Sequence, residues 1–341
     1  MILLFIISIN LVFNSLNYNT YIIAEIGINH EGSYSLCKEM VYAAKEAGVK
    51  AVKLQTINPD KSYAYDTESY RLFSMSKLTK TETRKIFELS KNLGLEIFTT
   101  VGDIETANWI KSLRPSAWKI SSSLLTHIPL ISHIAKFREK KFISTGLAKN
   151  KEIKDIVEIF GKKRNNFSLL HCVSKYPTEV DEINLSRIQF LKNKYNVEVG
   201  YSDHSKGVLA SCLAIAKGAT IIEKHFTFDK KRNGFDHKIS LDYKGMKNLV
   251  NNVIETEKII SVNKSFLKTI EVNRKKFLRV LVANKKILKG CRLNEKNLSI
   301  KRVRNNNNGL APSYYEKLLG RLVRKTYKKD EVISKIELNN D

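Results

Sequence analysis

The sequence predicts an α/β fold: a (β/α)8 barrel followed by a small second domain. Short apolar runs alternate with amphipathic helical patterns eight times between residues 21 and 260, and the composition changes after residue 276. Eight such units over roughly 240 residues are typical of a closed parallel barrel. An open doubly wound sheet is the alternative, but no G-x-G-x-x-G pattern follows the first apolar run.

The strands of this barrel are expected where short apolar runs lie between turn residues. They are YIIAEIGI (21–28), KAVKLQT (50–56), LEIFTT (95–100), AWKIS (117–121), KFISTG (141–146), FSLLHC (167–172), VEVGYS (197–202) and ATIIEKHF (219–226). Helical patterns fill the intervals between them. The helices before Gly48 and Gly94 end at glycine, the residue preferred just after a helix.

The two ends of the chain do not follow this alternation. Residues 1–20 are an apolar extension with no basic residue before the apolar run and no A-x-A cleavage site. The run is too short for a typical membrane span, so we expect a packed or poorly ordered extension, with a weak membrane anchor as the alternative. Residues 261–276 form a polar, basic linker, and residues 277–341 have the short strands and turns of a small separate domain.

The cysteines and the charge indicate the setting in which the protein works. Cys37, Cys172, Cys212 and Cys291 lie far apart without a C-x-x-C pair, which favours free thiols in a reducing, cytoplasmic compartment. The net charge is +25, and residues 258–341 hold 22 Lys and Arg against 7 Asp and Glu. Because no nucleic-acid-binding motif accompanies these residues, we expect a field that attracts phosphorylated or carboxylated substrates, and no nucleic acid partner.

Two histidines end consecutive predicted strands. His204 follows Ser202-Asp203, and His225 follows Glu223-Lys224. Because the carboxyl ends of parallel strands meet on one face of a barrel, where ligands bind, we expect the two imidazoles to lie close together. Neutral imidazoles suit a divalent transition metal, although either histidine alone would be better interpreted as an ordinary hydrogen-bonded residue.

Polar side chains also end the other strands, and two of these are lysines among apolar neighbours. Lys53 and Lys119 lie within strands, where a lysine is rare unless it is paired or has a function. A single lysine would suit a Schiff base, as in an aldolase. Two lysines accompanied by serine and threonine hydroxyls instead favour a bound phosphate or carboxylate.

A set of motifs occurs in the order IIAEIGINHEGS, VKLQT, STG, LLHCVSKYPT, VGYSDHS and EKHFT. The set resembles the sialic acid (N-acetylneuraminate) synthase family, which includes the legionaminate and pseudaminate synthases. The tail resembles the antifreeze-like SAF domain, of the β-clip type, that follows the barrel in that family. The resemblance covers nearly all of residues 21–341.

This resemblance implies an activity and its cofactor. The activity is that of a transferase that condenses phosphoenolpyruvate with an N-acetylated aldose, such as N-acetylmannosamine or a deoxy-diacetamido sugar, and releases phosphate. The implied cofactor is a divalent metal, commonly Mn²⁺, with Mg²⁺ and Co²⁺ as alternatives. The implied assembly is a homodimer with exchanged tail domains.

The resemblance also assigns roles to residues of this chain. His204 and His225 match the metal ligands. Glu25, Tyr176 and Asp236 match groups near the sugar and the reacting carbons. Arg302 matches a tail-domain arginine that acts in trans, reaching the active site of the partner subunit. The residues that match the phosphoenolpyruvate site are Lys53, Thr100, Lys119, Ser122, Ser144 and Ser202.

Two positions depart from the family pattern. At the fourth strand the family has K-I-x-S-x-[ED], but here Leu124 stands in place of the acidic residue. In the tail, the family's R-P-G is replaced by Arg302-Val-Arg-Asn before a run of asparagines. Two other interpretations therefore stay open. One is a related phosphoenolpyruvate-dependent or aldolase-type condensation on another sugar, and the other is a catalytically silent homologue that serves binding or assembly.

Overall fold

The computed structural model describes residues 18–161, 166–261, 265–304 and 309–338. The chain divides after Ser261 into two compact units, which are described separately. In the described part of the first unit, eight parallel strands close into a barrel in chain order, with β1 paired to β8. The predicted (β/α)8 barrel is therefore confirmed.

The strands of the barrel match the predicted runs to within two residues at either end. They are β1 (Tyr21–Gly27), β2 (Ala51–Gln55), β3 (Glu96–Thr100), β4 (Ala117–Ile120), β5 (Lys140–Ser144), β6 (Phe167–His171), β7 (Glu198–Asp203) and β8 (Ile221–His225).

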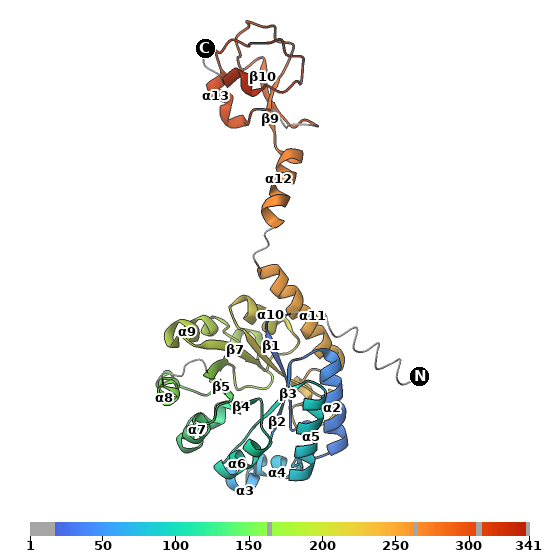
Figure 1. Cartoon of the computed structure of the whole chain (residues 1–341), viewed down its shortest axis with the longest axis vertical. Helices are drawn as coiled ribbons and strands as arrows, with labels where there is room; N and C mark the ends of the chain where they lie inside the picture. The colour runs from blue at the N-terminus through green and yellow to red at the C-terminus, as the bar shows by residue number, and fades with distance from the viewer. Residues whose placement is uncertain (1–17, 162–165, 262–264, 305–308, 339–341) are drawn as a thin grey trace, which may run out of the picture. The chain divides into compact units, whose positions relative to one another are not determined.

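Helices surround the barrel and connect successive strands (Figure 1). They are α2 (Tyr34–Ala47), α3 (Pro59–Ser62), α4 (Glu68–Met75), α5 (Lys80–Asn92), α6 (Ile104–Ser112), α7 (Ile128–Ala135), α8 (Asn150–Phe160), α9 (Ser186–Tyr195), α10 (Leu209–Ala216) and α11 (Tyr243–Ile260). Short 3-10 turns lie at η1 (Ser122–Leu124), η3 (Val180–Glu182) and η4 (His237–Ile239).

The helix ends follow from local sequence. Ser33 begins α2 by accepting a hydrogen bond from the Leu36 amide, and Gly48 ends it in the left-handed conformation, with φ of 91°. Thr79 and Glu82 form a reciprocal capping box at the start of α5. These signals explain why the helix that precedes Gly48 was predictable from sequence.

An apolar floor closes the interior of the barrel near the amino ends of its strands. The floor consists of Ile23, Ala51, Phe98, Ala117, Phe142, Leu170 and Ile221. Gly200 lies at the same level, where a Cβ atom would come within 2.6 Å of Leu170 Cδ2 and Ile221 Cβ. The floor is thus filled to the point that β7 has no room for a side chain there.

The last helix of the barrel is tied to its first strand. Glu257 of α11 accepts hydrogen bonds from the amides of Asn19 and Thr20 and from the Thr20 hydroxyl. Helix α11 also packs against α2. Residues 1–17 of the predicted apolar extension lie outside the described residues.

The second unit contains α12 (Ser265–Phe277), β9 (Val280–Ala283), β10 (Leu298–Lys301), η5 (Pro312–Tyr314), α13 (Tyr315–Leu318) and η6 (Lys335–Leu338). Helix α12 occupies most of the segment predicted as a linker. Strands β9 and β10 pair antiparallel above a small apolar core that includes Leu281, Leu293 and Tyr327. The buried Glu337 accepts hydrogen bonds from the Tyr327 hydroxyl and the Arg324 amide, which ties the end of this unit to its core.

Each cysteine lies in the described part of the chain and is a free thiol, as predicted. Among the described residues, no helix has both the length and the apolar character needed to cross a membrane.

Candidate active site

The barrel interior changes from apolar to polar two residues beyond the floor along each strand. Side chains alternate along a strand, so the residue two places beyond each floor residue points into the barrel as well. All eight such side chains carry polar or ionisable groups and are buried: Glu25, Lys53, Thr100, Lys119, Ser144, Cys172, Ser202 and Glu223. We call this set the polar layer. It contains half of the predicted site residues.

The charged members of the polar layer form one cluster. Lys53 Nζ lies 2.6 Å from Glu25 Oε2 and 3.8 Å from Glu223 Oε2, and Lys119 Nζ lies 3.0 Å from Glu223 Oε1. Burial tends to raise the pKa of Glu223, but the ammonium groups of Lys119 and Lys53 outweigh it and keep that pKa below its usual range. Glu223 therefore stays ionised and links the two lysines.

Hydroxyl groups line the same level of the barrel. Ser202 Oγ donates a hydrogen bond of 2.8 Å to Glu223 Oε1, and Thr100 Oγ1 lies 3.5 Å from Lys53 Nζ. Ser144 Oγ is buried and has no hydrogen-bond partner among the described residues. Ser122, just beyond β4, accepts a hydrogen bond of 3.0 Å from the Gly146 amide. Hydroxyl groups and lysines thus lie together at one buried level, a combination of groups that suits an oxyanion.

The two predicted metal ligands lie side by side at the upper edge of the polar layer. The ring centroids of His204 and His225 are 5.5 Å apart. Burial and the neighbouring His225 lower the pKa of His204 to about 3, so its imidazole is neutral near pH 7. The structure thus brings together the histidines that sequence analysis paired.

The hydrogen bonds of these rings fit a metal ion. His204 Nδ1 is 2.6 Å from the Val173 carbonyl, which makes Nδ1 the donor and leaves the lone pair on Nε2, 3.4 Å from Ser202 Oγ. The buried Nδ1 of His225 makes no hydrogen bond to the described residues. Among the described residues, no group of three or more His, Cys, Asp and Glu side chains is arranged to hold a metal ion. A metal here would take further ligands from substrate or water.

Tyr176 and Asp236 lie around the histidines. The Tyr176 ring is 4.3 Å from the His204 ring and 6.0 Å from the His225 ring, between centroids, and half of this side chain is exposed. Asp236 Oδ2 lies 3.5 Å from His225 Nδ1, and the Asp236 amide donates to Asn29 Oδ1. These two residues therefore face the solvent-accessible side of the centre, above the lysines.

Arg302 belongs to the second unit. Its guanidinium stacks over the Phe277 ring at 4.6 Å, and Nε donates a hydrogen bond to the Lys276 carbonyl. A role for Arg302 in the barrel stays a prediction.

Leu124 ends η1, and its half-buried side chain packs against the core between the strands and the outer helices. Its position is that of a packing residue, so the structure gives a physical reason for an apolar side chain where the family pattern has a carboxylate.

Glu223, Gln55 and Cys172 belong to the centre, but sequence analysis did not assign them to the site. Gln55 Nε2 donates a hydrogen bond of 2.8 Å to Glu25 Oε1, so that carboxylate is held by both Lys53 and Gln55. The two-residue alternation was the available signal. Lys53 and Gln55 share a strand face, and Glu223 precedes His225 by two residues on another.

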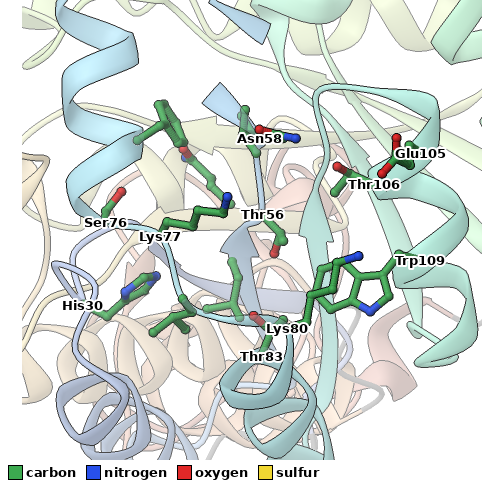
Figure 2. Close-up of a pocket in the computed structure, with 15 residues that line it drawn as sticks. His30, Thr56, Asn58, Ser76, Lys77, Lys80, Thr83, Glu105, Thr106 and Trp109 are labelled. Atoms are coloured by element: carbon green, nitrogen blue, oxygen red, sulfur yellow. The ribbon is translucent and has the colours of Figure 1, made fainter. Parts of the chain in front are cut away.

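A cavity of about 110 Å³ lies beside this centre, between the end of β2 and helices α5 and α6 (Figure 2). In Figure 2, His30 and Trp109 stand on opposite sides of it with Thr56 between them. Gln55 lines this cavity and also contacts Glu25 in the centre. The cavity therefore adjoins the polar layer, and its wall combines aromatic, hydroxyl and amide groups with Lys77 and Lys80.

Comparison with family models assigns both units. Residues 40–265 match the model of the NeuB family, and residues 279–338 match the model of the SAF domain. The first match includes the barrel from within α2 onward, and the second includes the second unit from just before β9 to the end of η6.

Named relatives share most of their length with this chain. It is 34% identical to an N,N'-diacetyllegionaminic acid synthase of Campylobacter jejuni, over 92% of this chain and 98% of that protein. It is 36% identical to a pseudaminic acid synthase of the same organism, over 92% and 96% of the two chains.

A solved structure agrees with these sequence relatives. It is that of an N-acetylneuraminic acid (sialic acid) synthetase from Leptospira borgpetersenii in complex with citrate, which is 35% identical to this chain. It matches with a TM-score of 0.71 over 75% of this chain and 92% of that one.

We predict that Leu124→Glu destabilises the protein by about 1–3 kcal/mol and does not improve catalysis, because it places a carboxylate against apolar neighbours. The check is thermal unfolding of the wild type, of Leu124→Glu and of a conservative Leu124→Met control. A Glu variant that melted with the wild type and was more active would contradict the packing role.

Proposed function

The chain belongs to the NeuB family and carries a C-terminal SAF domain, and from that premise we propose that it is a nonulosonic acid synthase. The proposed substrates are phosphoenolpyruvate and an N-acetylated aldose of the N-acetylmannosamine or deoxy-diacetamido type. Carbon 3 of phosphoenolpyruvate bonds to the aldehyde carbon, water adds to carbon 2, and inorganic phosphate leaves. We place this reaction in the cytoplasm, in keeping with the free thiols.

The observation that carries this proposal is the pair of buried lysines in the polar layer. Phosphoenolpyruvate bears its carboxylate and its phosphate on one carbon, so it needs cations close together. Lys53 and Lys119 are linked through Glu223, with the Thr100, Ser144 and Ser202 hydroxyls at the same level. Glu25 and Glu223 hold the ammonium groups in place, which reduces the ordering cost of binding the anion.

We propose that His204 and His225 hold a divalent metal, Mn²⁺ in the first instance, with Mg²⁺ or Co²⁺ as substitutes. Bound there, the metal would supply Lewis-acid polarisation of the aldehyde oxygen. The neutral His204 imidazole, oriented by the Val173 carbonyl, supports this assignment. Tyr176 would cover the sugar on the open side of the histidines.

Two carboxylates are available for proton transfer at different depths. Glu25 is in the polar layer beside Lys53, at the level proposed for carbon 2. Asp236 is beside His225, at the level proposed for the aldehyde. We therefore assign Glu25 to the proton of the attacking water and Asp236 to the sugar end, with Gln55 orienting Glu25.

The acceptor end of the reaction involves the cavity of Figure 2 and the second unit. Because Gln55 lines that cavity and contacts Glu25, we propose that the far end of the sugar extends toward it. We further propose a homodimer in which Arg302 of one subunit acts in the active site of the other.

The experiment that tests the function is a screen for phosphate release from phosphoenolpyruvate with Mn²⁺. The acceptors are N-acetylmannosamine and its deoxy-diacetamido relatives, and we expect turnover with at least one of them. Turnover only with a different sugar would favour a related condensation. A folded, metal-loaded protein inactive with all of them would favour a binding or assembly role.

Lys53→Ala and Lys119→Ala should each raise the KM for phosphoenolpyruvate and lower kcat. Loss of a charge-assisted contact to a buried anion costs about 2–4 kcal/mol of transition-state binding. Lys141→Met is the matched control, because Lys141 is a fully buried strand lysine outside the polar layer that donates to the Phe137 carbonyl. Trapping of substrate on Lys53 or Lys119 by borohydride would instead indicate a Schiff-base aldolase.

Removal of the metal with EDTA should abolish turnover, and Mn²⁺ should restore it. His225→Ala should lose both metal and activity, since each imidazole supplies a ligand. His133→Ala is a suitable control, because His133 lies on α7 and contacts Asn108. Full activity of His225→Ala in the presence of EDTA would disprove the metal assignment.

A further inference from the structure

The residue just before each of the two histidines is charged, and its side chain points away from the barrel interior. Asp203 precedes His204 at the end of β7, and Lys224 precedes His225 at the end of β8. By strand alternation their side chains lie on the helix-facing side of the barrel wall. Asp203 and Lys224 are register partners in the sheet, and both are completely buried.

These two side chains are the centre of a closed hydrogen-bonding network. Lys224 Nζ lies 3.1 Å from Asp203 Oδ2, which also accepts a hydrogen bond of 2.6 Å from Ser211 Oγ of α10. Asp203 Oδ1 accepts from the Ser205 amide at 2.8 Å and from Ser205 Oγ at 2.6 Å. Lys224 Nζ also donates to the Ser205 carbonyl.

The network fixes the backbone on both sides of His204. Asp203 is the residue before it, and Ser205, the residue after it, is held through its amide, hydroxyl and carbonyl. Through Lys224 the same contacts reach the residue adjacent to His225 on the neighbouring strand. A shift of either strand end would therefore have to break buried charged hydrogen bonds.

A buried ion pair of this kind adds little net stability to a barrel. Taking both charges out of water offsets much of their attraction, and apolar residues of similar volume are often at least as stabilising. Burial lowers the pKa of the Lys224 ammonium group, and the nearby Asp203 carboxylate only partly offsets this effect. What the pair does provide is a directional connection between two particular strand ends.

We propose that the Asp203–Lys224 pair is a positioning device that sets the spacing of His204 and His225 for the metal. The proposal rests on the metal site of the proposed function. Neither residue touches substrate or metal. They act by holding the adjacent main chain, so that both imidazoles are preorganised before the ion arrives.

The test compares Lys224→Met and the charge-balanced double variant Asp203→Asn/Lys224→Met with wild type. In Lys224→Met, Asp203 keeps three hydrogen-bond donors, from Ser205 and Ser211, so its charge stays solvated by the protein. The double variant removes the charge pair altogether and provides an answer should the single variant fail to fold. Lys141→Met controls for loss of a buried strand lysine away from the histidines.

Two quantities are measured on metal-free protein: the Kd for Mn²⁺, from the EPR signal of the free ion, and the melting temperature. We expect the Lys224 variants to bind Mn²⁺ about 10–100-fold more weakly than wild type, as is usual when supports of metal ligands are removed. Lys141→Met should keep the wild-type Kd whatever its melting temperature.

Each outcome is decisive. Wild-type Mn²⁺ affinity in a folded Lys224→Met or double variant would overturn the positioning role and leave the metal site intact. Equal weakening in Lys141→Met would also overturn it, because any loss of stability would then suffice. A wild type that bound no Mn²⁺ would overturn the metal proposal itself, and the positioning role with it.

Discussion

The constraint on which the rest of the molecule depends is the placement of two lysines and two glutamates inside a closed barrel. Buried charges of this kind are tolerated only if they satisfy one another, and Lys53, Lys119, Glu25 and Glu223 do so through direct contacts. The apolar floor below them excludes water from the opposite end. The histidines lie above these charges, so the ionic cluster and the two imidazoles follow one axis of the barrel.

Most of this arrangement was predictable, because the strands of a parallel barrel all have their carboxyl ends on the same face. Eight apolar runs predict the strands. The convergence of parallel strand ends then predicts that Glu25, Lys53, Lys119, His204 and His225 lie close together. The register of the strands adds the finer division into floor and polar layer. That division follows from alternation alone once Gly200 is recognised as a floor residue with no space for a side chain.

Contacts made across the barrel could not be predicted from the sequence. Glu223 looks like an ordinary polar residue of β8 until Lys53 and Lys119 are placed on either side of it. Leu124 looked like a missing catalytic acid, but the structure packs it against the outer core. Arg302 lies in a unit with its own core, and its proposed action in a partner's active site depends on an assembly that one chain does not contain.

The pairing of the first strand of the barrel with the last has a consequence for synthesis of the chain on the ribosome. Strand β1 finds its second neighbour only in β8, and the amides preceding β1 are held by Glu257 of α11. The ribosome adds about 5–20 residues per second, so one edge of β1 waits on the order of 10–40 s for β8 to emerge. Throughout that interval the nascent barrel is an open sheet with an unsatisfied edge, the form most exposed to pairing with another chain. The nascent chain should therefore need chaperones most while roughly its first 220 residues are emerging, and less once β8 pairs with β1 and closes the barrel.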